Sequence, residues 1–347
     1  MRNYVTISSI ARELGLSHST VSRALRDHPR ISKTTKLRVK QFAKERGYYP
    51  TSTGNRLKES SKLITVIVPN IAVHFFAKVI ENIQRVLERE DFDILLVNTM
   101  ESYHREKQAI ESSFQNRVSG VIASISSETT DFQHYQMLLD HEIPLVFFDR
   151  VVNFLPAPKI VANDYQAAYD ATHHLIISGC KRIAHITGSG NLNNSNNRLY
   201  GYLDALRNHN IQIQEDLVHY YEFNPYSIDN FLKKALLKYN DLDGIFVFHD
   251  YAAHYTINLL QKWGKRIPED ISIMGFSDEP LASYRNPKLS TVQEVANRMG
   301  QLAGKKMMSL VKNGEPMLNE KVIIEQELVL RETTNQPIEH KQDFPSQ

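Results

Sequence analysis

The chain has 347 residues, very little cysteine and no long apolar run. Cys180 is the only cysteine, which excludes an internal disulfide framework and a cysteine-based zinc cluster within one chain. No stretch approaches the roughly 18 consecutive apolar residues of a membrane-spanning helix. The amino terminus is polar, and Arg12 and Glu13 interrupt its first apolar stretch, so no signal peptide is indicated. We expect a soluble, cytoplasmic protein without a membrane partner.

The sequence also lacks the motifs of common catalytic and cofactor sites. It contains no Gly-x-Ser-x-Gly elbow and no Walker loop, and the Gly-Ser-Gly at 188–190 lacks the third glycine of a dinucleotide fingerprint. His173 and His174 are adjacent on an expected helix and point in different directions. His249 and His254 have no carboxylate-histidine motif near them. We therefore expect no catalytic residues, no cofactor and no metal.

Charge is present but unevenly distributed. Residues 1–62 carry 14 Lys and Arg against 4 Asp and Glu, whereas residues 63–347 carry 27 against 35, so the net +2 divides into +10 and −8. Lys and Arg that neutralise phosphates release condensed counterions, which favours binding of a polyanion. With 41% hydrophobic residues, the chain can bury more than one core. We expect a small head that binds nucleic acid and a larger body with another task.

Residues 1–50 predict three short helices. Thr6 is placed to cap a helix with apolar residues at helical spacing, and Gly15 ends it. Ser17 is placed to cap a second helix after a very short turn, and a third helix begins at Ser32. Two helices joined so tightly are typical of a helix-turn-helix. The head is therefore expected to be a small all-α domain that binds DNA.

In this motif the second helix enters the major groove by its N-terminal end. Arg23 is the strongest candidate for reading a base, because a guanidinium can bond bidentately to O6 and N7 of guanine. The alternative is that the polar residues of this helix are only a solvated face. The residues expected to contact DNA in the head are Thr6, Ser17, His18, Ser19, Thr20, Ser22, Arg23, Arg30 and Ser32.

The head resembles the amino-terminal domain of a known family. Residues 5–17 read VTISSIARELGLS and residues 19–25 read STVSRAL, with RISKTT at 30–35 and GYYP at 47–50. These runs resemble the headpiece of the lactose-repressor and galactose-repressor family of bacterial transcription regulators. The order of elements after residue 62 also fits, so the resemblance covers nearly the whole chain.

Residues 51–62 are rich in Ser, Thr and Lys, a composition typical of a flexible linker. The resemblance implies that residues 53–58 form a hinge helix on operator DNA, where Asn55 and Leu57 contact the duplex and Leu57 pairs with its dimer mate as an apolar wedge in the minor groove. Gly54 departs from this pattern, since glycine costs a helix about 1 kcal/mol relative to alanine. We expect ordering of the hinge to depend strongly on DNA.

From residue 63 onward, short apolar runs alternate with amphipathic helices, which is typical of parallel α/β sheets. About nine strands are too many for one compact sheet of this kind. The sequence therefore predicts two doubly wound parallel-sheet lobes, and the resemblance implies the architecture of periplasmic binding proteins. The apolar runs lie at 64–69, 94–98, 120–125, 145–148, 182–187, 218–222, 244–248 and 272–275.

The expected domain division follows from these runs. The helix-turn-helix domain occupies residues 1–50, the hinge 51–62, the two-lobed body 63–340 and the tail 341–347. Lobe 1 comprises about 63–162 and 292–325, and lobe 2 about 163–290 and 326–340.

Open parallel sheets bind ligands beyond the carboxyl ends of their strands, which places a ligand site in the cleft between the lobes. By resemblance, Arg198 in NRLYGY matches the family's effector-binding arginine. Ser277 stands where the family usually has an aspartate, and His249 where an amide is common, so a plain hexose is not assured. The residues expected to bind the effector are Asn70, Phe75, Phe76, Asp149, Arg150, Asn194, Arg198, His249, Asp250, Ser277 and Asp278.

Three structural alternatives stay open for these residues. The aromatic pair Phe75 and Phe76 is equally compatible with the core at the start of a helix. Asp149 and Arg150 are equally compatible with a structural ion pair, and Asp278 with ordering its own loop.

The sequence favours a DNA-binding transcription regulator, a repressor controlled by a small effector such as a sugar or sugar derivative. A solute-binding protein would need an export signal and no DNA-reading head, and an α/β enzyme would need a catalytic constellation that is not found. One head makes few base contacts, so a homodimer on two half-sites of double-stranded operator DNA is expected. Effector binding would shift the lobes and the spacing of the paired hinges.

Overall fold

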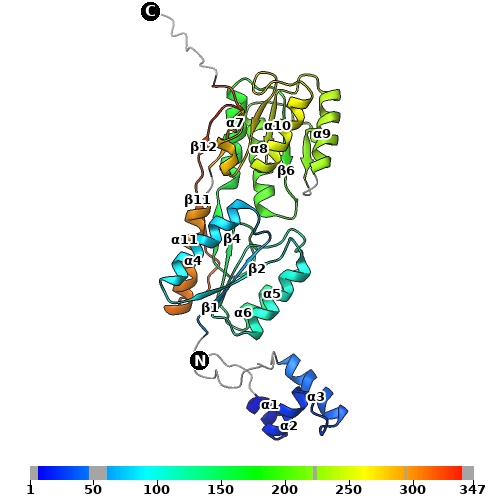
Figure 1. The fold of residues 1–347 in the computed structure, drawn as a ribbon, viewed down its shortest axis with the longest axis vertical. Helices are drawn as coiled ribbons and strands as arrows, with labels where there is room; N and C mark the ends of the chain where they lie inside the picture. The colour runs from blue at the N-terminus through cyan, green and yellow to red at the C-terminus, as the bar shows by residue number, and fades with distance from the viewer. Residues whose placement is uncertain (1–6, 47–60, 222–224, 294, 338–347) are drawn as a thin grey trace, which may run out of the picture.

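The structure, a computed structural model, describes residues 7–46, 61–221, 225–293 and 295–337. Figure 1 shows a small helical head near the amino terminus and an elongated body in which two α/β lobes are stacked end to end. Several segments named above lie outside the described residues. They are Thr6, residues 51–60 of the hinge with Asn55 and Leu57, and the tail at 341–347.

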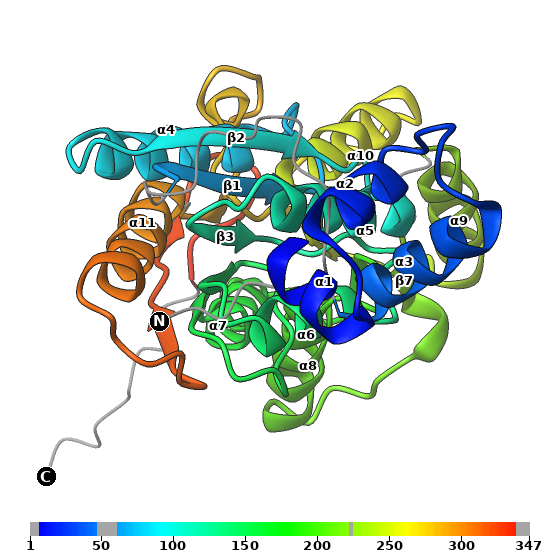
Figure 2. The same cartoon turned by 90° about the horizontal axis from the view of Figure 1, so that it is seen from below.

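The head consists of three short helices around a small apolar core (Figure 2). Gly15 ends the first helix with φ of +65°, a conformation that glycine adopts without steric cost. The Ser17 hydroxyl caps the second helix by accepting a hydrogen bond from the backbone N–H of Thr20 at 3.1 Å. This arrangement confirms the predicted helix-turn-helix. The helices are α1 (Ile7–Leu14), α2 (His18–Leu25) and α3 (Lys33–Glu45).

Lobe 1 is built on a six-stranded sheet in the order β11-β5-β4-β3-β1-β2, in which all neighbouring strands are parallel. Two helices pack on each face, and each pair buries its own apolar cluster against the sheet. The strands are β1 (Leu63–Val68), β2 (Asp93–Asn98), β3 (Gly120–Ala123), β4 (Leu145–Phe148), β5 (Lys159–Ala162) and β11 (Lys321–Ile324). The helices are α4 (His74–Glu88) and α11 (Ala296–Lys312) on one face, and α5 (Tyr103–Gln115) and α6 (Gln133–Asp140) on the other.

Lobe 2 is a four-stranded parallel sheet in the order β7-β6-β8-β9, again with two helices on each face. Its strands are β6 (Ile183–Thr187), β7 (Val218–Tyr220), β8 (Gly244–Val247) and β9 (Ser272–Met274). Its helices are α7 (Asp164–Ile177) and α8 (Asn193–Asn208) on one face, α9 (Pro225–Lys238) and α10 (Asp250–Lys262) on the other, and the short 3-10 turns η1 (Glu215–Leu217) and η2 (Pro280–Ser283).

Three segments connect the lobes. The chain enters lobe 2 between β5 and α7, returns to lobe 1 through β10 (Thr291–Val292), and passes back through β12 (Leu328–Val329). The strands β10 and β12 pair antiparallel with each other. Because these segments are held together, a movement of one lobe against the other must act through them.

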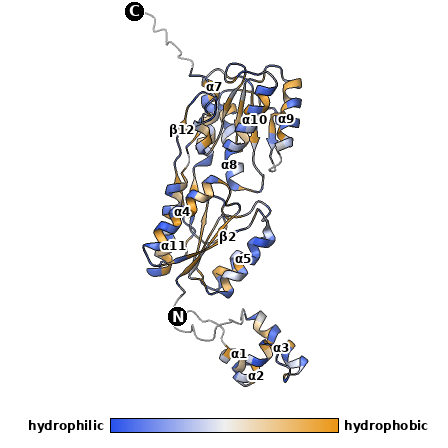
Figure 3. Ribbon diagram, viewed as in Figure 1, coloured by the Kyte–Doolittle hydropathy of each residue, from blue (hydrophilic) through white to orange (hydrophobic). Residues whose placement is uncertain are grey.

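The described residues form twelve strands, whereas the sequence predicted about nine and located eight of them by their apolar runs. The prediction missed β5, β10, β11 and β12. β10 and β12 have two residues each, and the apolar runs of β5 and β11 are only three residues long, at 160–162 and 322–324. These runs are shorter than the four to eight apolar residues typical of a buried strand. Figure 3 shows the hydropathy pattern on which the correct strand predictions depended: the strands inside the body are apolar, and the helices alternate between hydrophobic and hydrophilic stretches.

The predicted fold class is confirmed: a small helix-turn-helix domain precedes two doubly wound parallel-sheet lobes. Within the described residues, no helix combines the length and the apolar character needed to cross a membrane.

Candidate functional site

The candidate DNA-reading surface lies on α2. His18, Ser19 and Arg23 are exposed, whereas Val21 and Ala24 on the opposite side of the helix are buried in the core of the head. The polar residues named for base reading therefore lie on the solvent face of the expected recognition helix. Amphipathic packing alone produces the same division, so the exposure of these residues does not test base reading.

Four other head residues contribute to the starts of helices. The hydroxyl of Ser17 lies 2.9 Å from that of Ser19 and 2.8 Å from that of Thr20. At α3, the Ser32 hydroxyl accepts a hydrogen bond from the backbone N–H of Thr35 at 3.1 Å. These contacts position the first turns of α2 and α3, whose N–H groups are suited to phosphate. Ser22 is half-buried, and Arg30 is exposed in the loop before α3.

In the body, Arg198 is the centre of a polar cluster at the carboxyl ends of the lobe 2 strands. Its Nε donates a hydrogen bond to Asp164 Oδ1 at 2.8 Å, and its Nη1 donates to the carbonyl oxygen of Phe248 at 2.6 Å. The guanidinium carbon lies 3.6 Å from the centroid of the Phe276 ring. Burial raises the pKa of Asp164 to about 6, although Arg198 opposes this shift. Arg198 is thus held in one orientation by three partners.

Sequence reasoning missed Asp164. It is the first residue of α7 and follows β5 after a single residue, the position type from which the other candidates were chosen. The signal was therefore available, but β5 had not been recognised as a strand.

Arg150 is held by a carboxylate that the sequence did not suggest. Its Nη1 lies 2.9 Å from both carboxylate oxygens of Glu101, whereas its Nε is 3.9 Å from Asp149 Oδ2. Its guanidinium also lies over the ring of Phe76, 5.7 Å from the centroid. Glu101 is the third residue after β2 and has φ of +61°. The stronger partner of Arg150 is therefore Glu101 and not the neighbouring Asp149.

Asp149 connects lobe 1 to the start of α8 in lobe 2. Its Oδ1 accepts a hydrogen bond from Asn194 Nδ2 at 3.2 Å, and the Oδ1 of Asn193 accepts one from the backbone N–H of Val151 at 3.0 Å. Leu192, just before α8, is buried in the second apolar cluster of lobe 1. Burial raises the pKa of Asp149, against the lowering effect of Arg150. The N-terminal end of α8 thus bridges both lobes, one turn before Arg198.

His249 caps α10 and packs against two aromatic rings, those of Phe248 and Tyr221. Its Nδ1 accepts a hydrogen bond from the backbone N–H of Ala252 at 3.0 Å. The imidazole lies 4.1 Å from the ring of Phe248 and 5.9 Å from that of Tyr221, measured between centroids. Burial, and next the charge of Arg198, lower the pKa of His249 to about 3. The imidazole is therefore neutral at pH 7.

Both carboxylate oxygens of Asp250 accept hydrogen bonds from other groups of the protein. Its Oδ1 accepts a hydrogen bond from the Thr291 hydroxyl at 2.7 Å, and its Oδ2 accepts one from the backbone N–H of Glu279 at 2.8 Å. Burial raises its pKa to about 7. Because Thr291 belongs to the connecting strand β10, Asp250 orders the crossing between the lobes, and both of its oxygens already have partners.

The loop after β9 is also held by internal contacts. Ser277 and Asp278 have φ of +106° and +40°, in the left-handed region that non-glycine residues rarely adopt. Asp278 Oδ1 accepts a hydrogen bond from Arg331 Nη2 at 2.7 Å. This contact agrees with the loop-ordering alternative for Asp278.

The remaining lobe 1 candidates have structural contacts as well. Phe76 is buried in the apolar core and packs edge to face on Phe148, and Phe75 packs half-buried against the same core. The side-chain oxygen of Asn70 accepts a hydrogen bond from the backbone N–H of Ala72 at 3.0 Å. Both phenylalanines therefore agree with the core alternative.

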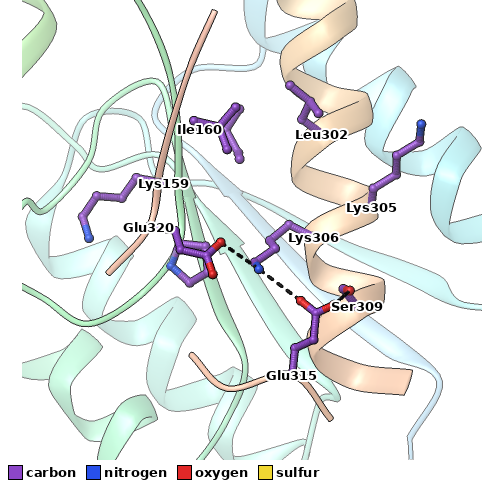
Figure 4. A pocket seen from close by; sticks show the side chains of 10 residues that line it. Lys159, Ile160, Leu302, Lys305, Lys306, Ser309, Glu315 and Glu320 are labelled. Atoms are coloured by element: carbon purple, nitrogen blue, oxygen red, sulfur yellow. Dashed lines mark hydrogen bonds and ion pairs between the residues drawn. The ribbon is translucent and has the colours of Figure 1, made fainter. Parts of the chain in front are cut away.

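A cavity of about 310 Å³ lies elsewhere in lobe 1, between α11 and the strands β5 and β11 (Figure 4). Lys306 Nζ lies between Glu315 and Glu320, at 3.1 and 2.9 Å from their carboxylate oxygens. None of the residues expected to bind an effector lines this cavity. In the part of the chain that the structure describes, no group of three or more His, Cys, Asp and Glu side chains is arranged to hold a metal ion.

The head and the two lobes together define a DNA-binding regulator whose body has the fold of periplasmic binding proteins. Residues 6–51 match the model of bacterial regulatory proteins of the lacI family, and residues 172–334 match the periplasmic binding protein-like domain. The chain is 30% identical over 336 residues to the ribose operon repressor of Halalkalibacterium halodurans, with 95% of this chain and 97% of that protein covered. The chain belongs to the lacI family of bacterial regulatory proteins, whose members are transcription regulators, and the predicted family is confirmed.

Solved structures agree with this assignment. A periplasmic binding protein/LacI transcriptional regulator of Alkaliphilus metalliredigens, complexed with D-xylulofuranose, is 28% identical with a TM-score of 0.68, and 79% of this chain and 99% of that chain are covered. The lac repressor dimer bound to operator and the anti-inducer ONPF has a TM-score of 0.69 at 22% identity, covering 95% and 98%. The second likeness concerns the fold alone.

Proposed function

We propose that this regulator is a cytoplasmic homodimeric repressor without enzymatic activity, which binds operator DNA through its head and a small effector between its lobes. The observation that carries the effector site is the position of α8. One helix bridges both lobes through Asn193 and Asn194 and presents Arg198 one turn later. The proposed domain division is the one expected from the sequence: residues 1–50, the hinge 51–62, and the body 63–340.

Polar and aromatic groups at this site suit a hydroxylated ligand. Asn194, Arg198 and the neutral imidazole of His249 offer donors and acceptors for paired hydroxyls. The rings of Tyr221 and Phe248 offer apolar faces for the carbon skeleton. The xylulofuranose complex of the Alkaliphilus regulator supports the same ligand class. Asp250, Asp278 and Phe76 are proposed to position the site, because their contacts lie within the protein.

The charges at the site favour an uncharged effector. Each arginine is already paired with a carboxylate, Arg150 with Glu101 and Arg198 with Asp164. Asp149 adds a third carboxyl group, and His249 is neutral. A phosphate or carboxylate on the ligand would have to compete with Glu101 or Asp164 for its arginine. We therefore propose a neutral sugar and not a sugar phosphate or sugar acid.

This proposal is tested by thermal unfolding of the full chain with neutral sugars, sugar phosphates, sugar acids and nucleobases. A ligand that binds only the folded state raises the melting temperature with its concentration. We expect a neutral sugar to produce the largest rise. A larger and saturable rise with an anionic sugar or a nucleobase would contradict the proposed ligand class.

The role of the head is tested by replacing Arg23 with alanine. We expect the variant to lose about 1–3 kcal/mol of discrimination, or roughly 5-fold to 150-fold, between an operator selected from random-sequence DNA and a scrambled duplex. Arg26, exposed at the C-terminal end of α2, offers a matched control of the same charge. Fluorescence anisotropy at fixed salt measures both affinities. If Arg26→Ala costs as much discrimination as Arg23→Ala, the assignment of Arg23 to base reading is wrong.

A further inference from the structure

Two half-buried histidines of lobe 2 have no role in the function proposed above. His173 on α7 and His209 at the end of α8 share a hydrogen bond, with 2.7 Å between His173 Nδ1 and His209 Nε2. Their ring centroids are 4.9 Å apart. A hydrogen bond between two neutral imidazoles requires one N–H and one nitrogen without a proton. His173 Nδ1 and His209 Nε2 therefore point toward each other.

The two helices hold these rings on a rigid frame. A Cβ atom at Gly201 of α8 would lie 2.3 Å from the carbonyl oxygen of Tyr165 on α7, so the helices touch at backbone distance. Next to the pair, Tyr169 stacks on His173 at 6.2 Å between centroids. The hydroxyl of Tyr169 accepts a hydrogen bond from Asn208 of α8 at 3.1 Å. Both imidazoles are therefore positioned by neighbours and not only by their mutual bond.

The electrostatic surroundings of the pair favour a cation. Contacts between α7 and α8 advance in the same direction along both helices, from Asp164 with Arg198 to His173 with His209. The helices are thus parallel, and their carboxyl ends, where the helix dipoles are negative, meet near the two rings. Asp170, one turn before His173, adds a carboxylate. Arg207 on the last turn of α8 is paired with Asp204 at 2.7 Å.

Metal binding needs neutral imidazoles. Burial, and next the neighbouring His209, lower the pKa of His173, and Asp170 only partly opposes this shift. This shift favours the neutral form of the His173 ring. The proton shared between the rings can move to the other nitrogen of the same imidazole by tautomerism, which leaves two bare nitrogens and releases no net proton.

We propose that His173 Nδ1 and His209 Nε2 bind a divalent transition-metal ion such as zinc, with water at the remaining positions. Zinc–nitrogen bonds of about 2.0–2.1 Å in tetrahedral geometry place two ligand nitrogens roughly 3.3 Å apart. The rings therefore need to separate by about half an ångström and to turn, so that both lone pairs meet at the ion. Imidazole suits zinc, copper and nickel. The bound ion cross-links α7 to α8, the two helices that carry Asp164 and Arg198.

The test uses the full chain, freed of metal with a chelator, and zinc chloride as the probe. Equilibrium dialysis at pH 7 is expected to show a zinc ion whose affinity falls about tenfold or more in both His173→Gln and His209→Gln. The exposed His104 of α5 supplies the control, and His104→Gln is expected to bind as the unaltered chain does. Zinc is also expected to raise the melting temperature of the unaltered chain and of His104→Gln, but of neither pair variant.

A variant that melts without zinc at the same temperature as the unaltered chain has kept its fold, so a loss of zinc binding then reports on the ligand itself. Full zinc affinity in both pair variants, or no zinc bound by the unaltered chain, overturns the proposal. Neither measurement requires DNA or an effector, and so the result is independent of the function proposed above.

Discussion

Replacing Arg198 with alanine is expected to abolish the response of operator binding to the effector while operator binding itself persists. The guanidinium is the only described side chain that joins Asp164, Phe248 and Phe276 in one cluster. We propose that the Arg198 guanidinium also donates two hydrogen bonds to the effector. Hydrogen bonds to charged groups are each worth about 1.5–3 kcal/mol, so losing both weakens effector binding roughly 100-fold or more. The head is unchanged, because it folds around its own core.

The same substitution leaves Asp164 buried without its partner. Breaking a buried ion pair costs about 3–5 kcal/mol, so the alanine variant is also expected to melt earlier. Arg198→Lys separates the two effects, because lysine keeps the charge beside Asp164 but lacks the planar fork of donors. Arg207→Ala, an exposed change on the same helix, is the control.

Effector titrations followed by melting temperature and by operator anisotropy measure these outcomes. We expect Arg198→Lys to fold normally and to lose the effector response, and Arg207→Ala to retain it. If Arg198→Lys binds the effector as tightly as Arg207→Ala does, the arginine is only structural and the effector site lies elsewhere.

The second large effect concerns pH. The pKa of His249 is lowered to about 3 in the folded chain, mainly by burial, against about 6.5 for an unperturbed histidine. Its contribution to stability is therefore fully present above about pH 6.5. It is lost as the pH falls toward the folded pKa, because the unfolded chain binds the proton first.

His249→Asn removes this dependence and keeps the helix cap. Asparagine is among the best N-cap residues, so its side chain can replace Nδ1 as acceptor from the backbone N–H of Ala252. Relative to this variant, the unaltered chain is expected to lose about 1 kcal/mol per pH unit between about pH 6 and pH 4. Asp250, whose pKa is raised to about 7, acts with the opposite sign in both proteins and cancels in the comparison.

Urea unfolding of both proteins across this pH range supplies the measurement. The exposed His104→Gln serves as a control and is expected to follow the unaltered chain. Parallel stability curves for His249→Asn and the unaltered chain would show that the imidazole is not held neutral by burial.

The head shows how far local sequence signals reach. Gly15, Ser17 and Ser32 act on their own helix ends, so the caps that they predict form without reference to the rest of the chain. Most of the buried parallel strands were also predictable, because both of their faces are covered and each reads as an apolar run. The exception is β5, which is fully buried but has an apolar run of only three residues. The exposed edge strand β11 was missed as well, because its apolar run at 322–324 is equally short.

The contacts around the proposed effector site were predictable only in part. Arg198 was proposed from its motif, whereas its partner Asp164 lies 34 positions away, and Glu101 lies 49 positions from Arg150. Asp250 was expected to face an effector, but both of its oxygens bind groups that the fold brings from residues 279 and 291. Spacing along the sequence carries no information about such partners.

The sequence by itself determined the division into a basic head and an acidic body, the helices of the head, the parallel-sheet class of the lobes and the family. These depend on composition, local capping and short-range periodicity, which are properties of neighbouring residues. Only the tertiary structure decided which carboxylate pairs with which arginine, and that α8 bridges the two lobes. Those contacts depend on burial and on where the strands end in space, because charges removed from water must find partners wherever the fold places them.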